Sequence, residues 1–500
     1  MGRSRSLLLA VAALAAVALA PTPGLSGPGS LALATAAFAA VLWITEGLPL
    51  PATALCVPIL LTLFGVFPTM AGALTGFADP VIFLLLGGFV LAAALQKHGL
   101  DRRVAYHLIA RLGTSPRRLV LAVMAATAAL SMVVSNSATT AMMIPVALGV
   151  AGAAGGELAA GGGTDGGELA SSSTDGGPSN LETALLLGTA YAASVGGVGT
   201  LIGTPPNALL AGFFSETYGV EVGFAQWMVV GLPLVAVALP LVYLVLTWVY
   251  PIELDRLPGG TRVIDAEWER LGRMTTAEGR VAAVFVLTAT LWGTRPLLAD
   301  LLPGLSDAGI AIGAGLLLFA LPAGTEERAL LVWEDAEELP WGVLLLFGGG
   351  LSLASAISNT GLAAWIGEGV NALRGGPTLL VVLGAVALIV LLTELTSNTA
   401  TTAAFLPILG AVAVGFGENP FLFAVPAALG ASSAFMLPVA TPPNAIVYGS
   451  GLLSIPEMSR AGVWLNLAFV VLIPLMAYGL LGVAFGVELG TVPAWASAGQ

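Results

Sequence analysis

The chain has 500 residues, of which 57% are hydrophobic and only 9% are charged, and its formal net charge at pH 7 is −12. Long apolar segments recur near the length of a bilayer crossing, so the composition excludes a set of soluble domains and predicts an all-α integral membrane protein. The single cysteine, Cys56, excludes an internal disulfide and a cysteine-based zinc site. No feature indicates a nucleic-acid partner.

The first apolar segment, residues 6–20, follows two arginines and ends in Ala18-Leu19-Ala20, which resembles a signal-peptidase site. Pro21 comes directly after that site and disfavours cleavage. We therefore expect a retained helix within residues 1–28, acting as a possible signal anchor, with a cleaved signal as the alternative.

Ten further segments are apolar over about the length of one crossing. Together with the first helix they predict about eleven transmembrane helices. The segments are 29–48, 51–67, 78–96, 183–213, 227–250, 281–300, 308–322, 341–357, 421–452 and 462–486.

Two other apolar segments, 118–150 and 377–415, are too long for one crossing and carry a polar motif near the middle. Polar, non-helical backbone at membrane depth is tolerated only where protein or a water-filled cavity surrounds it. We therefore expect each segment to form a re-entrant hairpin with the motif at its tip.

The two motifs are copies of each other. Ser135-Asn136-Ser137 recurs 262 residues later as Ser397-Asn398-Thr399, and each copy is followed by a Thr-Pro-Pro-Asn break, at Thr204 and at Thr441. Polar and helix-breaking clusters that are duplicated inside apolar sequence indicate a binding site with two related halves.

Each copy contains five expected crossings and one hairpin, and an odd number means that the second copy enters the membrane from the opposite side. The chain is thus predicted to be an inverted-topology repeat with broken helices at 183–213 and 421–452. The predicted domains are residues 1–28, repeat 1 at 29–250, a cytoplasmic linker at 251–280, repeat 2 at 281–486 and a tail at 487–500.

Lysine and arginine gather in linkers that lie on one side of this topology, within residues 3–5, 97–118 and 256–280. The opposite linkers, around 214–226 and 303–307, contain none. Because positive charge marks the cytoplasmic side, we expect a multi-pass plasma-membrane protein with a cytoplasmic N-terminus.

The motif side chains offer ligands for a cation and for an anion. Asn136 and Asn398 each carry an amide oxygen and two N–H donors, and hydroxyls flank them. The helix that begins after each tip directs its N-terminal N–H groups toward the site, which favours an anion. Since the candidate spans carry basic residues only at their ends, co-bound cations are expected to compensate the anion.

Hydroxyl, amide and unwound backbone oxygens suit Na⁺, a hard cation, and the paired prolines of each break free nearby carbonyls. One predicted Na⁺ cluster consists of Ser131, Ser135, Asn136 and the Gly203 carbonyl. Its repeat-related counterpart consists of Thr393, Thr396, Asn398 and the Ala440 carbonyl.

From Trp43 (WITEGLPLP) to Gly451 (LPVATPPNAIVYGSG) the chain resembles the divalent-anion/sodium symporters, which carry di- and tricarboxylates or sulfate. The resemblance implies a homodimer and elevator-like movement of the hairpin-bearing domain. It also implies that the two clusters hold Na⁺ and that the substrate contacts Asn136, Ser137, Asn398, Thr399 and Pro442. We add the threonines that open the two breaks, Thr204 and Thr441, as substrate-binding candidates.

Ser137 departs from the threonine that is usual in this family, so a methyl group is lost and the pocket is slightly larger. We expect a secondary active transporter, not an enzyme, that couples uptake of a C4-dicarboxylate (succinate, malate or fumarate) to Na⁺. The alternatives are a sulfate or tricarboxylate symporter and a Na⁺-independent dicarboxylate exchanger. An enzyme is disfavoured because no base lies beside a candidate nucleophile, and a channel would be recognised by unitary currents.

Three acidic residues lie in or beside apolar segments, where ionisable side chains are functional candidates by default. Glu46 and Asp79 directly precede helix-breaking sequence and are expected at span ends. Glu394 lies next to Thr393 near a hairpin tip, and we expect it either to have a structural role or to tune the cation site.

Overall fold

The computed structural model describes residues 2–112, 115–160, 179–252, 262–298, 300–324, 328–369 and 376–497. Within these ranges the regular structure is helical, and Pro322 and Ala329 form an isolated antiparallel bridge. The prediction of an all-α protein is thereby confirmed for the described part. Residues 161–178 of predicted repeat 1, residues 253–261 of the predicted linker and residues 498–500 of the predicted tail lie outside it.

The N-terminal helices pack as a group, α1 on α2 and α2 on α3. Ser26 starts α2, because its hydroxyl accepts a hydrogen bond from the Gly29 N–H at 3.1 Å. The elements of this region are α1 (Arg3–Leu19), α2 (Gly27–Thr45), α3 (Leu50–Leu63), α4 (Met70–Ala73) and the 3₁₀ turn η1 (Thr75–Ala78).

The next seven helices contain the first motif and the first break. They are α5 (Pro80–Lys97), α6 (Leu100–Leu112), α7 (Pro116–Ser131), α8 (Asn136–Ala160), α9 (Asn180–Gly197), α10 (Pro205–Tyr218) and α11 (Phe224–Val249). Four helices follow before the second copy: α12 (Arg262–Leu271), α13 (Thr276–Leu298), α14 (Asp307–Ala320) and α15 (Trp333–Glu337).

The second copy has the same order of long and broken helices. It comprises α16 (Trp341–Asn359), α17 (Leu362–Gly369), α18 (Thr378–Thr393), α19 (Asn398–Phe416), α20 (Phe421–Ala431), α21 (Pro442–Gly449) and α22 (Ile455–Phe485), followed by the short α23 (Ala494–Ser497).

Sequence chemistry sets the ends of the helices around the breaks. Ser179 and Glu182 form a capping box at the start of α9, in which the Ser179 N–H donates to the Glu182 carboxylate at 2.7 Å. Paired prolines occupy the first positions of α10 and α21, where a missing N–H costs no helical hydrogen bond. The predicted broken helices at 183–213 and 421–452 are therefore each two helices separated by a non-helical segment.

Seven helices in the described part are long and apolar enough to cross a membrane: α2, α5, α11, α13, α16, α19 and α22. Four shorter helices, α3, α14, α18 and α20, are also apolar. The coarse prediction of a multi-span helical protein agrees with this, while the count of about eleven crossings stays a prediction.

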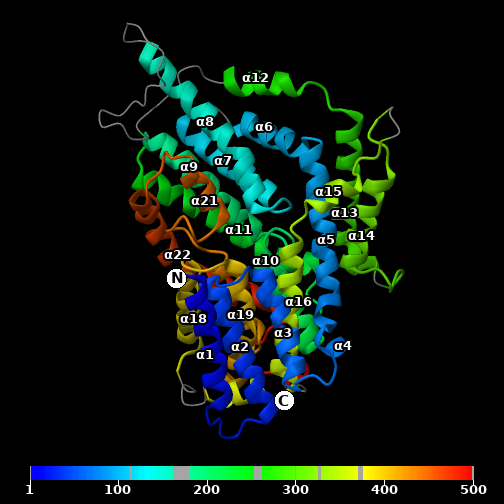
Figure 1. The fold of residues 1–500 in the computed structure, drawn as a ribbon. Helices are drawn as coiled ribbons and strands as arrows, with labels where there is room; N and C mark the ends of the chain where they lie inside the picture. Colours follow the sequence, from blue (N-terminus) through cyan, green and yellow to red (C-terminus); the bar gives the residue numbers. More distant parts are fainter. Residues whose placement is uncertain are drawn as a thin grey trace.

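Helices α10 and α21 cross between the two copies. In Figure 1, α7, α8, α9 and α11 lie in the upper part of the molecule, and α18 and α19 lie in the lower part with α1, α2 and α3. Yet α10 packs on α16, α19 and α20 of the second copy, and α21 packs on α8 and α9 of the first. The helix that follows each break therefore packs against helices of the other copy.

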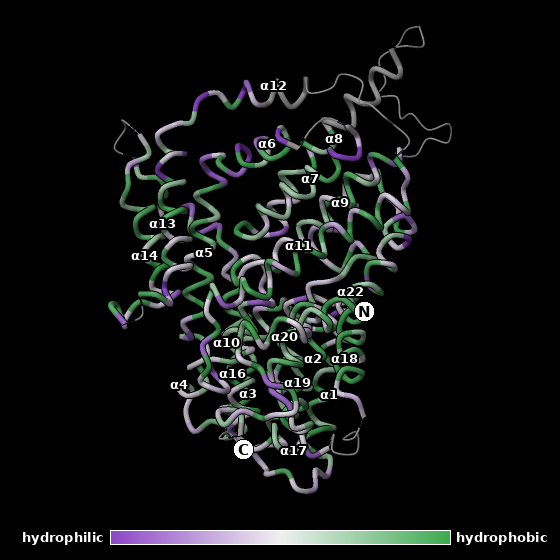
Figure 2. The backbone as a smooth tube through the Cα atoms, turned by 180° about the vertical axis from the view of Figure 1, so that it is seen from behind, coloured by the Kyte–Doolittle hydropathy of each residue, from purple (hydrophilic) through white to green (hydrophobic). Residues whose placement is uncertain are grey.

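The body of the molecule presents apolar side chains outward. Large exposed hydrophobic residues include Leu63, Trp248, Leu316 and Leu391. Figure 2 shows mostly hydrophobic helices in the body and hydrophilic residues concentrated along α12 and α6 at one end. Such a surface is suited to a lipid environment, since a monomeric soluble protein does not expose extended apolar faces.

Candidate functional site

The first tip is a short non-helical segment between α7 and α8. Helix α7 ends at Ser131, and α8 begins at Asn136. The Ser135 hydroxyl accepts a hydrogen bond from the Ala138 N–H at 3.3 Å, so it caps α8. Ser135 is exposed, and its hydroxyl makes no hydrogen bond to Ser131 or Asn136 in the described part of the chain.

Ser131 and Asn136 form the centre of the first cluster. The Ser131 hydroxyl lies 2.6 Å from the Asn136 side chain and donates to the Ala193 carbonyl at 2.7 Å. The same end of the Asn136 amide lies 3.2 Å from the carbonyl oxygens of Ala193 and Gly203. With its nitrogen at this end the amide donates to all three oxygens, and with its oxygen there four oxygen atoms converge on one point.

Gly203 makes this close approach possible. A Cβ atom at Gly203 would lie 2.4 Å from the Gly197 carbonyl oxygen and 3.0 Å from that of Ser131. The break therefore lies against the ends of both α9 and α7, and the contact with Gly197 leaves no room for a side chain at position 203.

The second cluster has the same design. The Thr393 hydroxyl contacts the Asn398 amide oxygen at 2.7 Å and the Ala431 carbonyl at 2.8 Å. Thr396 instead lies 2.6 Å from the Thr401 hydroxyl and donates to the Leu392 carbonyl. Within the described residues, no hydrogen bond joins Thr396 or Ala440 to Thr393 or Asn398.

Asn207 and Asn444, the last residues of the two Thr-Pro-Pro-Asn motifs, hold the breaks in shape. The Asn207 amide donates to the carbonyls of Gly197, Val198 and Thr200, the last at 2.7 Å. The Asn444 amide donates to those of Ala434 and Leu437, at 3.3 and 3.1 Å. Sequence reasoning did not assign this role, although the duplication of the asparagine was a usable signal.

The predicted substrate-binding residues occupy helix starts. Asn136 and Ser137 begin α8, Asn398 and Thr399 begin α19, and the exposed Pro442 begins α21. Thr441 caps α21 by accepting from the Asn444 N–H at 3.3 Å, whereas the Thr204 side chain makes no cap bond to α10. Helix α21 packs on α8 and α10 packs on α19, so the helix after each break contacts the helix that begins at the other copy's tip.

The acidic residues near the apolar segments have different settings. Asp79 caps α5 through the Val81 N–H at 2.8 Å, and Glu46 ends α2 with a φ of 48°. Their prediction as helix-end residues is confirmed. Glu394, in contrast, is buried, and its carboxylate accepts hydrogen bonds from the backbone of the second break.

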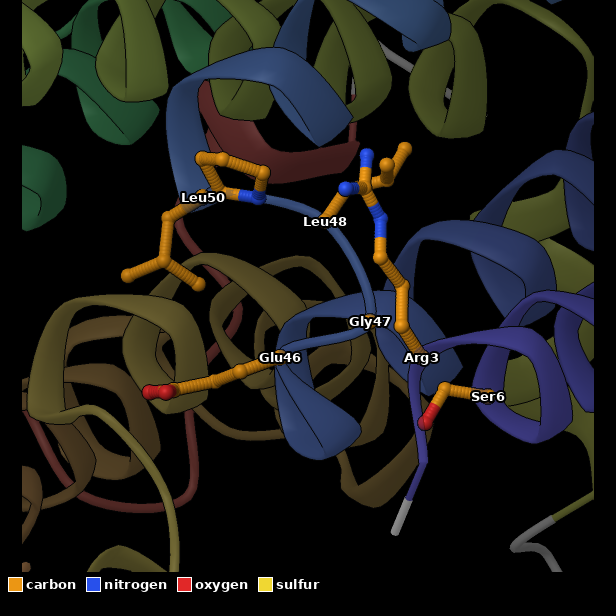
Figure 3. Close-up of a pocket in the computed structure, with 7 residues that line it drawn as sticks. Arg3, Ser6, Glu46, Gly47, Leu48 and Leu50 are labelled. Carbon is orange, nitrogen blue, oxygen red and sulfur yellow. The ribbon is translucent and has the colours of Figure 1, made fainter.

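A separate cavity of about 500 Å³ lies between the start of α1 and the α2–α3 connection. Its lining includes Arg3, Ser6 and Glu46 and none of the predicted site residues. Figure 3 shows the Arg3 and Glu46 side chains extending in different directions. The cavity is therefore not part of the candidate site.

Comparison with known proteins gives consistent results over nearly the whole chain. The family model of the sodium:sulfate symporter transmembrane region matches residues 2–486. Sodium-dependent dicarboxylate transporters SdcS from Staphylococcus aureus strains USA300 and bovine RF122 / ET3-1 are each 41% identical over 468 residues, which is 92% of this chain and 88% of theirs.

Among solved structures, the Alcanivorax borkumensis YdaH transporter has a similar fold, with a TM-score of 0.53, 18% sequence identity, and coverage of 83% of this chain and 87% of that one. This likeness concerns the fold alone. The family match and the sequence relatives together show that the chain is a multi-pass membrane protein and belongs to the sodium:sulfate symporter family.

Proposed function

We propose that this protein is a secondary active transporter of the plasma membrane that takes up a C4-dicarboxylate, such as succinate, malate or fumarate, together with Na⁺. The observation that carries the proposal is the pair of matching clusters, Ser131 with Asn136 and Thr393 with Asn398, each beside a helix break. The 41% identity to sodium-dependent dicarboxylate transporters over 92% of the chain supports this substrate class.

The first cluster offers the oxygen-rich surroundings that Na⁺ requires. When the Asn136 amide oxygen faces inward, it meets the Ser131 hydroxyl and the carbonyls of Ala193 and Gly203 within 3.2 Å. In this orientation four oxygen atoms face one another with only the Ser131 hydroxyl proton between them. Such an arrangement is unfavourable unless a cation binds there. We assign one Na⁺ to Ser131, Asn136 and the Gly203 carbonyl, with Ser135 at the edge.

The second Na⁺ is assigned by the repeat. Thr393 and Asn398 reproduce the hydroxyl–amide pair, and we add Thr396 and the Ala440 carbonyl as the further ligands of this second Na⁺. Each pair already points oxygen atoms at a helix break, so little rearrangement of the tip is needed when the cation arrives.

The substrate is assigned to the helix starts between the clusters. Neither tip and neither break contains a lysine or arginine. N–H groups at the starts of α8, α19 and α21 and two sodium ions therefore balance the two carboxylates. The residues that we assign to substrate contact are Asn136, Ser137, Asn398, Thr399 and Pro442, together with Thr204 and Thr441.

The proposal includes an inverted repeat, two re-entrant hairpins, a cytoplasmic N-terminus, a homodimer and an elevator-type movement. Support for the repeat comes from the reciprocal exchange of α10 and α21 between the two copies. Each tip is hydrogen-bonded to the break of its own copy, so a tip and its break are expected to move together.

Uptake into proteoliposomes tests the function. We expect succinate uptake to depend on an inward Na⁺ gradient and to collapse when choline replaces Na⁺. Uptake that continues without Na⁺ but requires unlabelled dicarboxylate on the far side would establish an exchanger. Na⁺-dependent uptake of sulfate or citrate, without uptake of succinate, would identify a sulfate or a tricarboxylate symporter.

A further inference from the structure

Glu394 is an ionisable residue buried at the second tip, directly after Thr393. It is 4% exposed. Its Oε1 atom accepts hydrogen bonds from the N–H groups of Phe435 and Met436 at 2.7 and 2.9 Å, and Oε2 accepts one from Leu437 at 3.0 Å. In the described part of the chain, no basic side chain forms an ion pair with it.

A fourth donor comes from α22. The Asn466 amide nitrogen lies 2.7 Å from Oε1, and the Asn466 amide oxygen is buried with no partner among the described residues. Three of the four donors are backbone N–H groups whose direction is fixed, so this donor set matches an ionised carboxylate. Glu394 thus places a negative charge on the residue that directly follows Thr393, at the tip that carries the second cluster.

In the first copy, a hydrogen bond between uncharged groups joins the tip to the break at the equivalent position. Position 394 corresponds to Met132 at the 262-residue offset of the tips, and position 437 corresponds to Thr200 at the 237-residue offset of the breaks. There the Thr200 hydroxyl donates to the Met132 carbonyl. The tip is tied to the break in both copies, but only the second tie carries charge.

We propose that Glu394 is a positioning residue that fixes the second tip to the 432–441 break and makes the second sodium cluster bind Na⁺ more tightly than the first. This inference rests on the proposed assignment of Na⁺ to Thr393 and Asn398. A cation bound next to Glu394 is attracted by a charge that is poorly screened by water, whereas the first cluster has only dipoles. The two sites are therefore filled in order, the second cluster first.

The charge acts in opposite directions on the two transported species. It attracts Na⁺ and repels a dicarboxylate, so removing it weakens Na⁺ binding without weakening substrate binding once Na⁺ is saturating. If Glu394 had a purely structural role, its replacement would loosen the break and weaken both Na⁺ binding and substrate binding.

The test measures succinate uptake by proteoliposomes containing wild-type protein or Glu394→Gln, over a range of Na⁺ concentrations. We expect the half-saturating Na⁺ concentration of Glu394→Gln to rise by on the order of ten-fold, with an unchanged or lower KM for succinate at saturating Na⁺. An unchanged Na⁺ requirement, or an equal rise in both constants, would overturn the proposal.

Two further variants test the proposal even if Glu394→Gln does not fold. Glu394→Asp keeps the charge and shortens the side chain, so we expect slower transport with a Na⁺ requirement within about three-fold of wild type. A rise as large as that expected for Glu394→Gln would show that charge is not the cause. Thr200→Val, the neutral tie of the first copy, should lower the maximal rate without a ten-fold change in the Na⁺ requirement.

The wild-type arm separates the two levels of inference. Na⁺-independent uptake by the wild type would remove the sodium clusters and the role of Glu394 with them. Na⁺-dependent uptake by the wild type with no shift in Glu394→Gln would remove only the role of Glu394.

Discussion

Different interactions hold the two helix breaks in place. The first break, between Gly197 and Thr204, folds back so closely on the end of α9 that a Cβ at Gly203 would overlap the Gly197 carbonyl oxygen. The second, between Ala431 and Thr441, has alanine at the equivalent position 440 and is held by the buried carboxylate of Glu394. The two copies therefore share the hydroxyl–amide contact of the tip, while different interactions hold the break beside it.

We expect the largest effect from replacing the asparagine that both tips contain. We expect Asn136→Ala and Asn398→Ala each to abolish succinate uptake while leaving the protein inserted, because each removes an amide that we assign both to a Na⁺ cluster and to the substrate site. Uptake by proteoliposomes and the elution profile of detergent-solubilised protein provide the measurements. Normal transport by both variants would refute the proposed site.

The next comparison sets Gly203 against its counterpart Ala440. Gly203→Ala introduces a Cβ 2.4 Å from the Gly197 carbonyl oxygen, so we expect a loss of about 1–3 kcal/mol of stability and most of the transport rate. Ala440→Gly adds only backbone freedom and should cost about 0.5–1 kcal/mol. Thermal unfolding in detergent checks both, and equal losses would remove the distinction between the two breaks.

A smaller effect is expected from exchanging the residues that follow the two asparagines. Ser137→Thr adds a methyl group to the first tip, and Thr399→Ser removes one from the second. We expect changes in the succinate KM of about two- to ten-fold, in line with the binding energy of one methyl group in a pocket. Competition with malate and sulfate should show a narrower substrate range for Ser137→Thr, and an unchanged range would place Ser137 outside the pocket.

The smallest effect comes from an exposed charge, in contrast to the buried Glu394. Lys97 and Asp335 form an ion pair of 2.5 Å between α5 and the start of α15. Burial alone would raise the pKa of Asp335, but the hydrogen bonds from Lys97 and the Val332 N–H, together with the charge of Lys97, lower that pKa. Lys97→Ala should therefore cost only about 0.2–1 kcal/mol at neutral pH.

The sign of the pH dependence follows from that lowered pKa. The stabilisation by the pair is fully present above the ordinary carboxylate pKa and is lost as the pH falls through the lowered value. Melting curves of wild type and Lys97→Ala should accordingly converge in acid. A difference that persists there would mean that packing of the lysine stem, and not the ion pair, stabilises the contact.

Much of the local structure follows from short-range sequence. The paired prolines start α10 and α21 wherever the rest of the chain lies, since proline cannot continue a preceding helix. Ser131 and Asn136 flank one tip, and Thr393 and Asn398 flank the other at the same spacing, so each hydroxyl–amide contact was predictable from the motif. The exposed Ser135 shows the limit of this reasoning. It was predicted as a Na⁺ ligand, but its hydroxyl caps α8 instead.

The amino-acid sequence by itself determined a helical membrane protein with duplicated polar tips and proline breaks, because apolar length, motif identity and proline geometry are local properties. Tertiary structure alone decided that α10 and α21 change halves and that Glu394 meets Phe435, Met436, Leu437 and Asn466. These contacts join segments far apart in the chain, and their partners are mainly backbone N–H groups, which every residue except proline carries. Only the folded chain shows which of those groups faces the carboxylate.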